Sequence, residues 1–270
     1  MRPTFLIISV ILSITVHPQQ IAGGAPFRQQ MAAAFQNSKN DLLAAGRQLG
    51  KLGEDIPPGV AFSGNTPFGI KNLGNYSLVF CYPGFGGSFL LGTDFTKSGD
   101  YNAMQTGIAY GMRFAETLSG GIKINYYSQS IRGYKGFKAF PVEASVLYTV
   151  TSKLQTGISF YNLVSVFRNK NVTERLPVFS AVGWRYQFSK VFTGALLISK
   201  EESGIVIFNP ALSIQMSDAF YFCSGYETGL SNWMLSAGYY LQGFNASIHF
   251  SIHPYLGLSG GMSIQWTAEK

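Results

Sequence analysis

The 270-residue chain lacks any hydrophobic run long enough to form a membrane-spanning helix. Such a helix needs about 20 consecutive apolar residues, but apolar stretches after residue 16 are soon broken by Gly, Asn, Ser, Lys or Arg. One shorter run, from Phe5 to Val16, follows Arg2 and precedes Pro18 and several small residues. This pattern is typical of a secretory signal peptide, which we place at residues 1–22. The alternative is a buried N-terminal helix.

The chain is also poor in charge, since only 12% of its residues are Asp, Glu, Lys or Arg. A typical soluble domain carries about 25%. By contrast, 22 Phe, 15 Tyr and 31 Gly are present. Abundant aromatics and glycines without a long apolar run indicate a transmembrane β-barrel, in which half of the strand residues face lipid. A secreted soluble β-sandwich would share the strand pattern but should carry more surface charge.

The net charge of +7 comes from basic residues scattered along the chain. No run of them would follow a phosphate backbone, so a nucleic-acid partner is not expected. We expect these residues in a barrel lumen and at its rims, near anionic lipid headgroups. The two cysteines, Cys81 and Cys223, fall on strands predicted to lie far apart and should not pair. No cofactor is expected.

The C-terminal segment shows the strand pattern most clearly. Apolar Met262, Ile264 and Trp266 alternate with Gly261, Ser263 and Gln265, as in a strand with one face toward lipid and the other toward a lumen. Gly261, Ile264 and Trp266 also resemble the C-terminal signal by which bacterial outer-membrane barrels are recognised for insertion. Here the final aromatic is followed by residues 267–270, a departure from that pattern.

Turn signals divide the region after Pro57-Pro58-Gly59 into about fourteen strands. A weak repeat, in which Gly121, Gly157 and Gly194 occupy equivalent places, supports this meander. An even strand count places both ends on one side of the membrane, the periplasm. The predicted strands cover residues 60–70, 76–82, 87–96, 101–114, 119–131, 138–150, 154–167, 176–188, 191–200, 205–216, 219–228, 232–241, 245–252 and 256–266.

Alternation along five of these strands assigns their faces, while the strand 191–200, with its Leu196-Leu197-Ile198, cannot be assigned. The polar face predicts lumen-lining residues: Arg113, Lys123, Glu143, Arg185, His249 and His253. The apolar face predicts lipid-facing aromatic girdles that could also serve for docking: Tyr126, Trp184, Tyr186, Trp233, Tyr239 and Trp266.

No catalytic or metal-binding constellation emerges from the sequence. His249 and His253 lie four apart on one strand, so their side chains are about 13 Å apart and cannot chelate one metal ion. An outer-membrane lipase would need His and Ser in hydrogen-bond reach on the outer face, whereas His249, His253 and Ser251 are assigned to the lumen. The chain is therefore expected not to be an enzyme.

Between the signal peptide and the barrel, residues 23–59 form a distinct segment. It is rich in Ala, Leu and Gln from Met31 to Leu52, which predicts helical or irregular structure. The predicted organisation is a signal peptide at 1–22, an N-terminal helical segment at 23–59 and a transmembrane antiparallel β-barrel at 60–270.

Together with the stretches YGMRFAETLSGGIKI, YTVTSKLQTGISF and HPYLGLSGGMSIQW, these features resemble the short FadL-type and PorV-type outer-membrane barrels of Bacteroidota. The resemblance implies that the N-terminal segment lies inside the barrel as a plug. In that superfamily the plug often carries an Asn-Pro-Ala element, but the corresponding stretch here, from Phe35 to Gly46, has no proline. No ligand residues are therefore transferred.

Loop length leads to a functional expectation. The outer turns look short, the longest running from Arg168 to Glu174, whereas receptors and transporters usually present long capturing loops. The sequence thus favours a non-enzymatic barrel that is an accessory subunit of an outer-membrane complex for protein secretion or barrel assembly. Its partners would be outer-membrane or periplasmic proteins and lipids. The alternatives are a FadL-like passive channel or transporter for hydrophobic or small solutes, and a structural barrel without partners.

Overall fold

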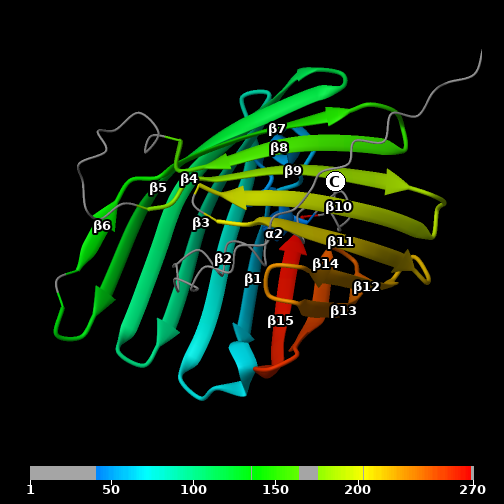
Figure 1. Ribbon diagram of the computed structural model, residues 1–270. Coiled ribbons are helices and arrows are strands. Elements are labelled where there is room, and N and C mark those ends of the chain that lie inside the picture. Colours follow the sequence, from blue (N-terminus) through cyan, green and yellow to red (C-terminus); the bar gives the residue numbers. More distant parts are fainter. Residues whose placement is uncertain (1–40, 135, 164–175, 203, 269–270) are drawn as a thin grey trace, which may run out of the picture.

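A computed structural model describes residues 41–134, 136–163, 176–202 and 204–268 (Figure 1). The predicted signal peptide and the predicted turn from Arg168 to Glu174 lie outside these residues. Within them, no helix is long and apolar enough to cross a membrane. The elements are the helices α2 (Leu42–Ala45), η1 (Leu49–Gly53) and η2 (Pro67–Gly69), and the strands β1 (Gly59–Thr66), β2 (Leu73–Gly84), β3 (Gly87–Ser98), β4 (Tyr101–Ala115), β5 (Leu118–Ile131), β6 (Phe137–Ala139), β7 (Val142–Thr149), β8 (Leu154–Tyr161), β9 (Phe179–Gln187), β10 (Phe192–Glu201), β11 (Val206–Gln215), β12 (Phe220–Glu227), β13 (Asn232–Leu241), β14 (Phe244–His253) and β15 (Gly257–Thr267).

The strands form one closed antiparallel meander. Apart from the short β6, each strand pairs with its neighbours in sequence, and β1 pairs with β15 to close the ring, with Gly59 opposite Thr267. We call the end where β1 begins and β15 ends the terminal end, and the other the distal end. A closed ring leaves no edge strand exposed, which a lipid environment requires. The predicted all-β antiparallel barrel with a short helical N-terminal segment is confirmed.

The short strand β6 is not an extra member of the ring. Both β6 and β7 pair with β5, and Phe140 and Pro141 separate them. Proline has no backbone N–H to donate to a ladder, although the Pro141 carbonyl still accepts from the Asn125 amide at 3.0 Å. Counting β6 and β7 as one interrupted strand gives the fourteen-stranded barrel that the turns predicted.

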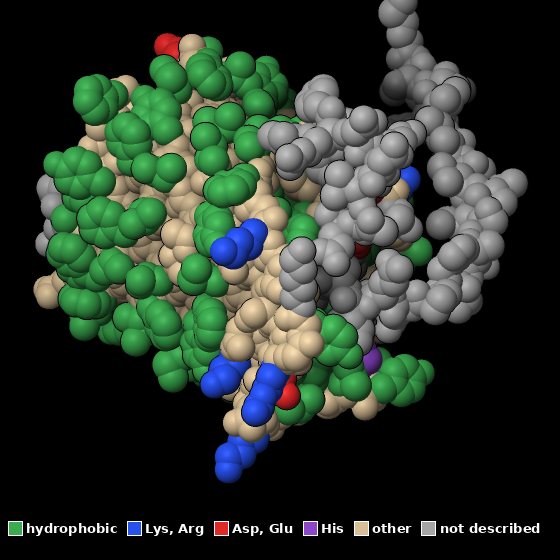
Figure 2. Space-filling model, turned by 90° about the vertical axis from the view of Figure 1, so that its left-hand side faces the viewer, with side chains coloured by type: hydrophobic (Ala, Val, Ile, Leu, Met, Phe, Trp, Pro, Cys, Tyr) green, Lys and Arg blue, Asp and Glu red, His purple; other side chains and the backbone are tan. Residues whose placement is uncertain are grey.

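The outer wall of the barrel is apolar. On β5, Ile122 and Ile124 are more than half exposed, whereas the alternating Lys123 and Asn125 are at most 3% exposed. The space-filling view shows hydrophobic side chains spread over the wall, with several Lys and Arg side chains at its lower rim (Figure 2). Such a surface suits the hydrocarbon core of a bilayer, with the charges at the headgroup level.

Inside the ring lies the inner segment, which we define as residues 41–56 (blue in Figure 1). Asp41 caps α2 by accepting a hydrogen bond from the Ala44 amide at 2.9 Å. Leu42, Leu49 and Leu52 are almost completely buried. Four residues cannot form a stable helix alone, so the surrounding barrel holds this short turn in place.

The barrel presents an apolar patch to the inner segment, although half of each strand was predicted to be polar. Side chains of β1 to β4 pack with the leucines in one cluster. A second cluster joins Ala44 to Leu147 and Leu197. Because Leu197 points inward while Leu196 is exposed on the outer wall, apolar residues occupy both faces of β10. This is why the strand 191–200 could not be assigned from alternation.

Inward-facing glycines allow the inner segment to approach the wall. A Cβ added to Gly121 would lie 2.8 Å from the Leu49 carbonyl oxygen, and one added to Gly111 would lie 2.6 Å from the same atom. This oxygen belongs to the backbone of the inner segment, so it cannot move aside by a side-chain rotation. By contrast, a Cβ at Gly194 would meet only the ring of Phe188 on the outer wall. The repeat glycines therefore differ in role, since Gly121 makes room for the inner segment and Gly194 does not.

Candidate functional site

A cavity of about 200 Å³ lies in the lumen. The inner segment forms one side of it, through Asp41, Ala44 and Arg47, and its wall belongs mainly to β1 to β3 and β12 to β15. It extends toward the distal end, where Ser251 and Ser259 line it. Concave sites with a few convergent polar groups are the usual places for ligand binding, so this cavity is the candidate functional site.

The strand register aligns four hydroxyl groups across the cavity wall. Ser77 on β2 is the register partner of Ser63 on β1, Ser63 of Ser263 on β15, and Ser263 of Ser247 on β14. We call these four residues the serine row. The hydroxyls of Ser247 and Ser263 lie 2.6 Å apart. The row thus runs continuously over the seam where the barrel closes.

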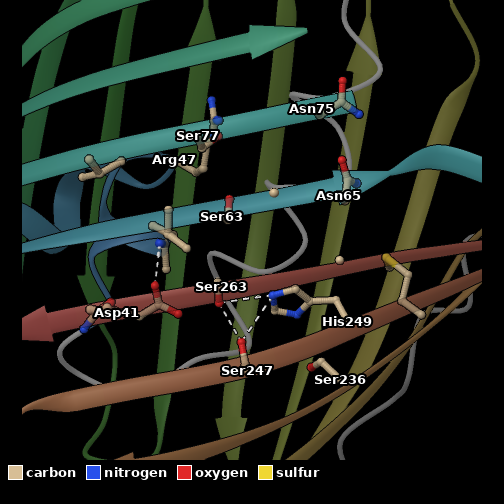
Figure 3. Close-up of a pocket in the computed structure, with 18 of the residues that line it drawn as sticks. Asp41, Arg47, Ser63, Asn65, Asn75, Ser77, Ser236, Ser247, His249 and Ser263 are labelled. Carbon is tan, nitrogen blue, oxygen red and sulfur yellow. Dashed lines mark hydrogen bonds between the residues drawn. The ribbon is translucent and has the colours of Figure 1, made fainter. Parts of the chain in front are cut away.

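A second row, the amide row, lies one inward position closer to the distal end. It contains Asn75, Asn65, His249 and Ser236, with Asn65 paired to Asn75 and His249 paired to Ser236. Between Asn65 and His249 stands Gly261, whose added Cβ would lie 2.7 Å from the Asn65 Cβ. Figure 3 shows Asn75 and Asn65 on neighbouring strands and His249 beside the serine row.

The charged groups at the inner-segment side of the cavity have partners. Arg47 forms an ion pair with Asp94, and Asp94 also accepts a hydrogen bond from Ser77. The Leu42 amide donates to Gln265 Oε1 of β15 at 2.9 Å. These contacts fix the inner segment to strands on both sides of the seam.

Lys123 and Glu143, both predicted to line the lumen, face each other across β5 and β7. Their Nζ and Oε1 atoms lie 3.6 Å apart, and both side chains are about 4% exposed or less. Glu143 Oε1 also accepts from Asn125 Nδ2 at 2.8 Å and from Gln105 Nε2 at 3.1 Å. The Tyr161 hydroxyl donates to Gln105 Oε1 at 2.8 Å. A buried charge pair needs such extra hydrogen bonds, so this group is a structural network beside the cavity.

The other predicted lumen residues are not brought together. Arg185 donates to Gln155 Oε1 at 3.4 Å, and Gln155 in turn reaches Glu54 of the inner segment. Arg113 is exposed at the end of β4, next to a register shift, and does not line the cavity. His253 lies at the distal end of β14, where its Nδ1 accepts from the Leu256 amide at 3.1 Å and its ring packs on Phe68.

The predicted aromatic girdle residues point outward. Trp184, Tyr186, Trp233, Tyr239 and Trp266 are all exposed, and Tyr126 is half-buried against Phe140. Of the predicted insertion signal, Ile264 and Trp266 share this outward face, whereas Gly261 faces the lumen. The girdle, docking and insertion roles of these residues stay predictions.

His249 lies within hydrogen-bond distance of two serines, which raises the question of nucleophilic catalysis. Its Nε2 is 3.3 Å from Ser247 Oγ and 3.2 Å from Ser263 Oγ (Figure 3). Acyl transfer also requires hydrogen-bond donors for the oxyanion. Here β14 is paired on both sides, so its backbone amides around His249 are engaged in the two ladders and do not supply such donors. The three side chains therefore form a hydrogen-bonded group on the cavity wall.

Sequence reasoning missed most of the site. Arg47 and Asp94 lie 47 residues apart, and neither belonged to a motif. Alternation assigned Ser236, Ser247, His249 and Ser263 to the lumen face, but their alignment with residues of β1 and β2 into two rows was missed, because single serines and asparagines on alternating strands look alike. An available signal was the recurrence of inward Ser and Asn on β1, β2, β14 and β15. No disulfide joins Cys81 and Cys223, as predicted, and both side chains are buried.

Among the described residues, no group of three or more His, Cys, Asp or Glu side chains could hold a metal ion. No protein-family model matches the chain, and no curated protein matches it.

Solved structures do match. The toluene transporter TbuX of Ralstonia pickettii superposes with a TM-score of 0.66 at 9% identity, over 89% of this chain and 98% of that one. A FadL homologue of Pseudomonas aeruginosa gives 0.62 at 9% identity, over 94% and 99%. The toluene transporter TodX of Pseudomonas putida gives 0.61 at 7% identity, over 87% and 95%. At these identities the likeness shows the fold, which is that of FadL-type outer-membrane barrels.

Proposed function

We propose that the protein is a passive outer-membrane channel for small solutes, in which the inner segment narrows the lumen. The observation that carries this proposal is the cavity inside a closed barrel, bounded on one side by the docked inner segment. Barrel diameter grows with strand number, so a fourteen-stranded barrel encloses more space than its own side chains fill, and the inner segment occupies only part of that space. The terminal end, which carries both Gly59 and Thr267, would face the periplasm.

The solved structures of the same fold support the channel over the accessory subunit that the sequence first favoured. They are two toluene transporters and a FadL homologue. The accessory reading depended on short outer turns, and the longest of these lies outside the described residues. Three predictions from the sequence stay predictions: the resemblance to PorV-type barrels, the origin in Bacteroidota and the signal peptide.

Flux through the barrel tests the proposal. Purified protein would be reconstituted in planar bilayers, and its ionic conductance compared with that of Gly121→Ala, in which the new Cβ displaces the inner segment. We expect Gly121→Ala to conduct at least severalfold more than the wild type. Deletion of residues 26–55 should raise conductance further. Gly194→Ala is the matched control, since its Cβ meets only an outward ring, and it should behave as the wild type.

One outcome of this experiment would contradict the channel proposal. If the wild type, Gly121→Ala and the deletion variant all insert as folded barrels yet none conducts ions or small solutes, the channel proposal is wrong.

A further inference from the structure

The charged side chains that line the cavity have opposite charges nearby. Arg47 pairs with Asp94, and Lys123 pairs with Glu143. Asp41 caps α2, which does not cancel its charge, and the positive charge of Lys51 acts on it from within the inner segment. A charged solute entering this space would have to lose its hydration without meeting a free counter-charge, which is costly. The wall of the cavity therefore favours a solute without net charge.

The wall nevertheless keeps hydrogen-bonding capacity. A hydroxyl can donate one hydrogen bond and accept two. Ser77 already donates to Asp94, and Ser247 and Ser263 share a hydrogen bond, so these hydroxyls offer a ligand mainly acceptor sites. In the amide row, Asn65 and Asn75 line the cavity, and a side-chain amide nitrogen can donate two hydrogen bonds. The two rows therefore combine acceptors with donors, as binding of a hydroxyl-rich ligand requires.

Carbon atoms form the larger part of the cavity wall, and the two rows place polar groups within it. A hydrocarbon ring lying against the rows would displace water from their remaining hydrogen-bonding groups, which costs free energy at each group. A solute that carries both hydroxyl groups and C–H faces can contact both kinds of surface, although two proteins of the same fold are named as toluene transporters. The cavity volume of about 200 Å³ also limits the solute to a small molecule.

We propose that the cavity binds a small, uncharged solute rich in hydroxyl groups, of the chemical class of a monosaccharide. The serine row and the amide row would contact its hydroxyls from adjacent levels of the wall, spanning the seam between β1 and β15. This inference rests on the proposed channel function and names the solute class of that channel.

Equilibrium binding to the full chain in detergent tests the solute class. Saturation-transfer NMR would compare methyl glucoside with glucuronate and glucosamine, which have similar size but carry opposite charges. We expect methyl glucoside to bind at least tenfold more tightly than either charged sugar, and saturating toluene not to displace it. Preference for a charged sugar, displacement by toluene, or no binding of any sugar would overturn the proposal.

Variants locate the binding. The double substitution Ser63→Ala with Ser263→Ala removes two hydroxyls of the serine row and should weaken methyl glucoside binding by about tenfold. Asn75→Leu, on another strand and in the other row, should weaken it severalfold. Ser224→Ala lies on β12 opposite Leu212 of the outer wall and serves as the control, with unchanged binding. Equal affinity of all variants would place the sugar elsewhere and refute this site.

The two proposals fail in different ways. Sugar binding without conductance in any variant would leave the binding site standing and remove the channel. Conductance that rises in Gly121→Ala, together with absence of sugar binding, would keep the channel and remove the solute class.

Discussion

Lys123 and Glu143 form a charge pair with almost no access to solvent, and each also depends on neighbouring polar groups. Glu143→Gln removes the negative charge but keeps an oxygen that can accept from Asn125 and Gln105. The positive charge of Lys123 is then left buried without its partner. We expect the free energy of unfolding to fall by about 3–5 kcal/mol, measured by urea-induced unfolding in lipid vesicles.

A second substitution separates charge from packing. Lys123→Met combined with Glu143→Gln removes both charges and preserves the acceptor, so it should recover most of the lost stability. If the double variant proves as unstable as the single one, hydrogen-bond geometry rather than charge holds this part of the wall together.

At the scale of elements, the inner segment is held by buried leucines rather than by its own helical structure. Leu49→Ala with Leu52→Ala should weaken its docking by several kcal/mol, because each truncation leaves a cavity in the apolar cluster. Hydrogen exchange at residues 42–53 should then accelerate while the barrel strands stay protected. Leu43→Ala, at a partly buried position of the same segment, is the control. Equal acceleration in the strands would mean that barrel and inner segment unfold together.

The closing strand β15 offers another element-level prediction. Trp266 lies outward at the terminal end, next to Val60 across the seam and Phe244 on β14. If it belongs to an insertion signal, Trp266→Ala should reduce the fraction of folded barrel in the outer membrane severalfold, as measured by heat-modifiable mobility on gels. Trp233→Ala, also outward but at the distal end of β13, should reduce it much less. If both variants lost the same fraction of folded barrel, Trp266 would act only as a general lipid contact and not as part of an insertion signal.

For the whole molecule, a channel that works alone should purify alone. Extraction of a tagged copy in mild detergent is expected to give a particle of one chain plus detergent, measured by light scattering. A stable complex with secretion or assembly proteins would instead restore the accessory-subunit interpretation, with the outward aromatics as the docking surface.

The overall barrel could be predicted from sequence because its determinants are local. Alternation and turn residues define each strand and its faces independently, and consecutive pairing then follows from short connections. The faces of a strand could not be assigned where both carried apolar residues, as at Leu196 and Leu197. Leu197 is apolar although it faces the lumen, because the inner segment covers it.

The site was less predictable because it depends on register between distant strands. His249 and Ser63 were assigned no relation by sequence, and they come together only once β1 pairs with β15 and β15 with β14. A shift of one residue in either pairing would send every second side chain to the other face. No local pattern reports this alignment, so the two polar rows appear only in the folded barrel.

The hydrogen bond from the Leu42 amide to Gln265 joins residues 223 positions apart, near the two ends of the folded chain. Its acceptor belongs to the strand that closes the ring, so this contact exists only when β15 lies beside β1. The leucines of the inner segment, by contrast, pack on β1 to β4. The inner segment therefore bridges the first strands and the last strand, and it couples its own attachment to the closure of the ring.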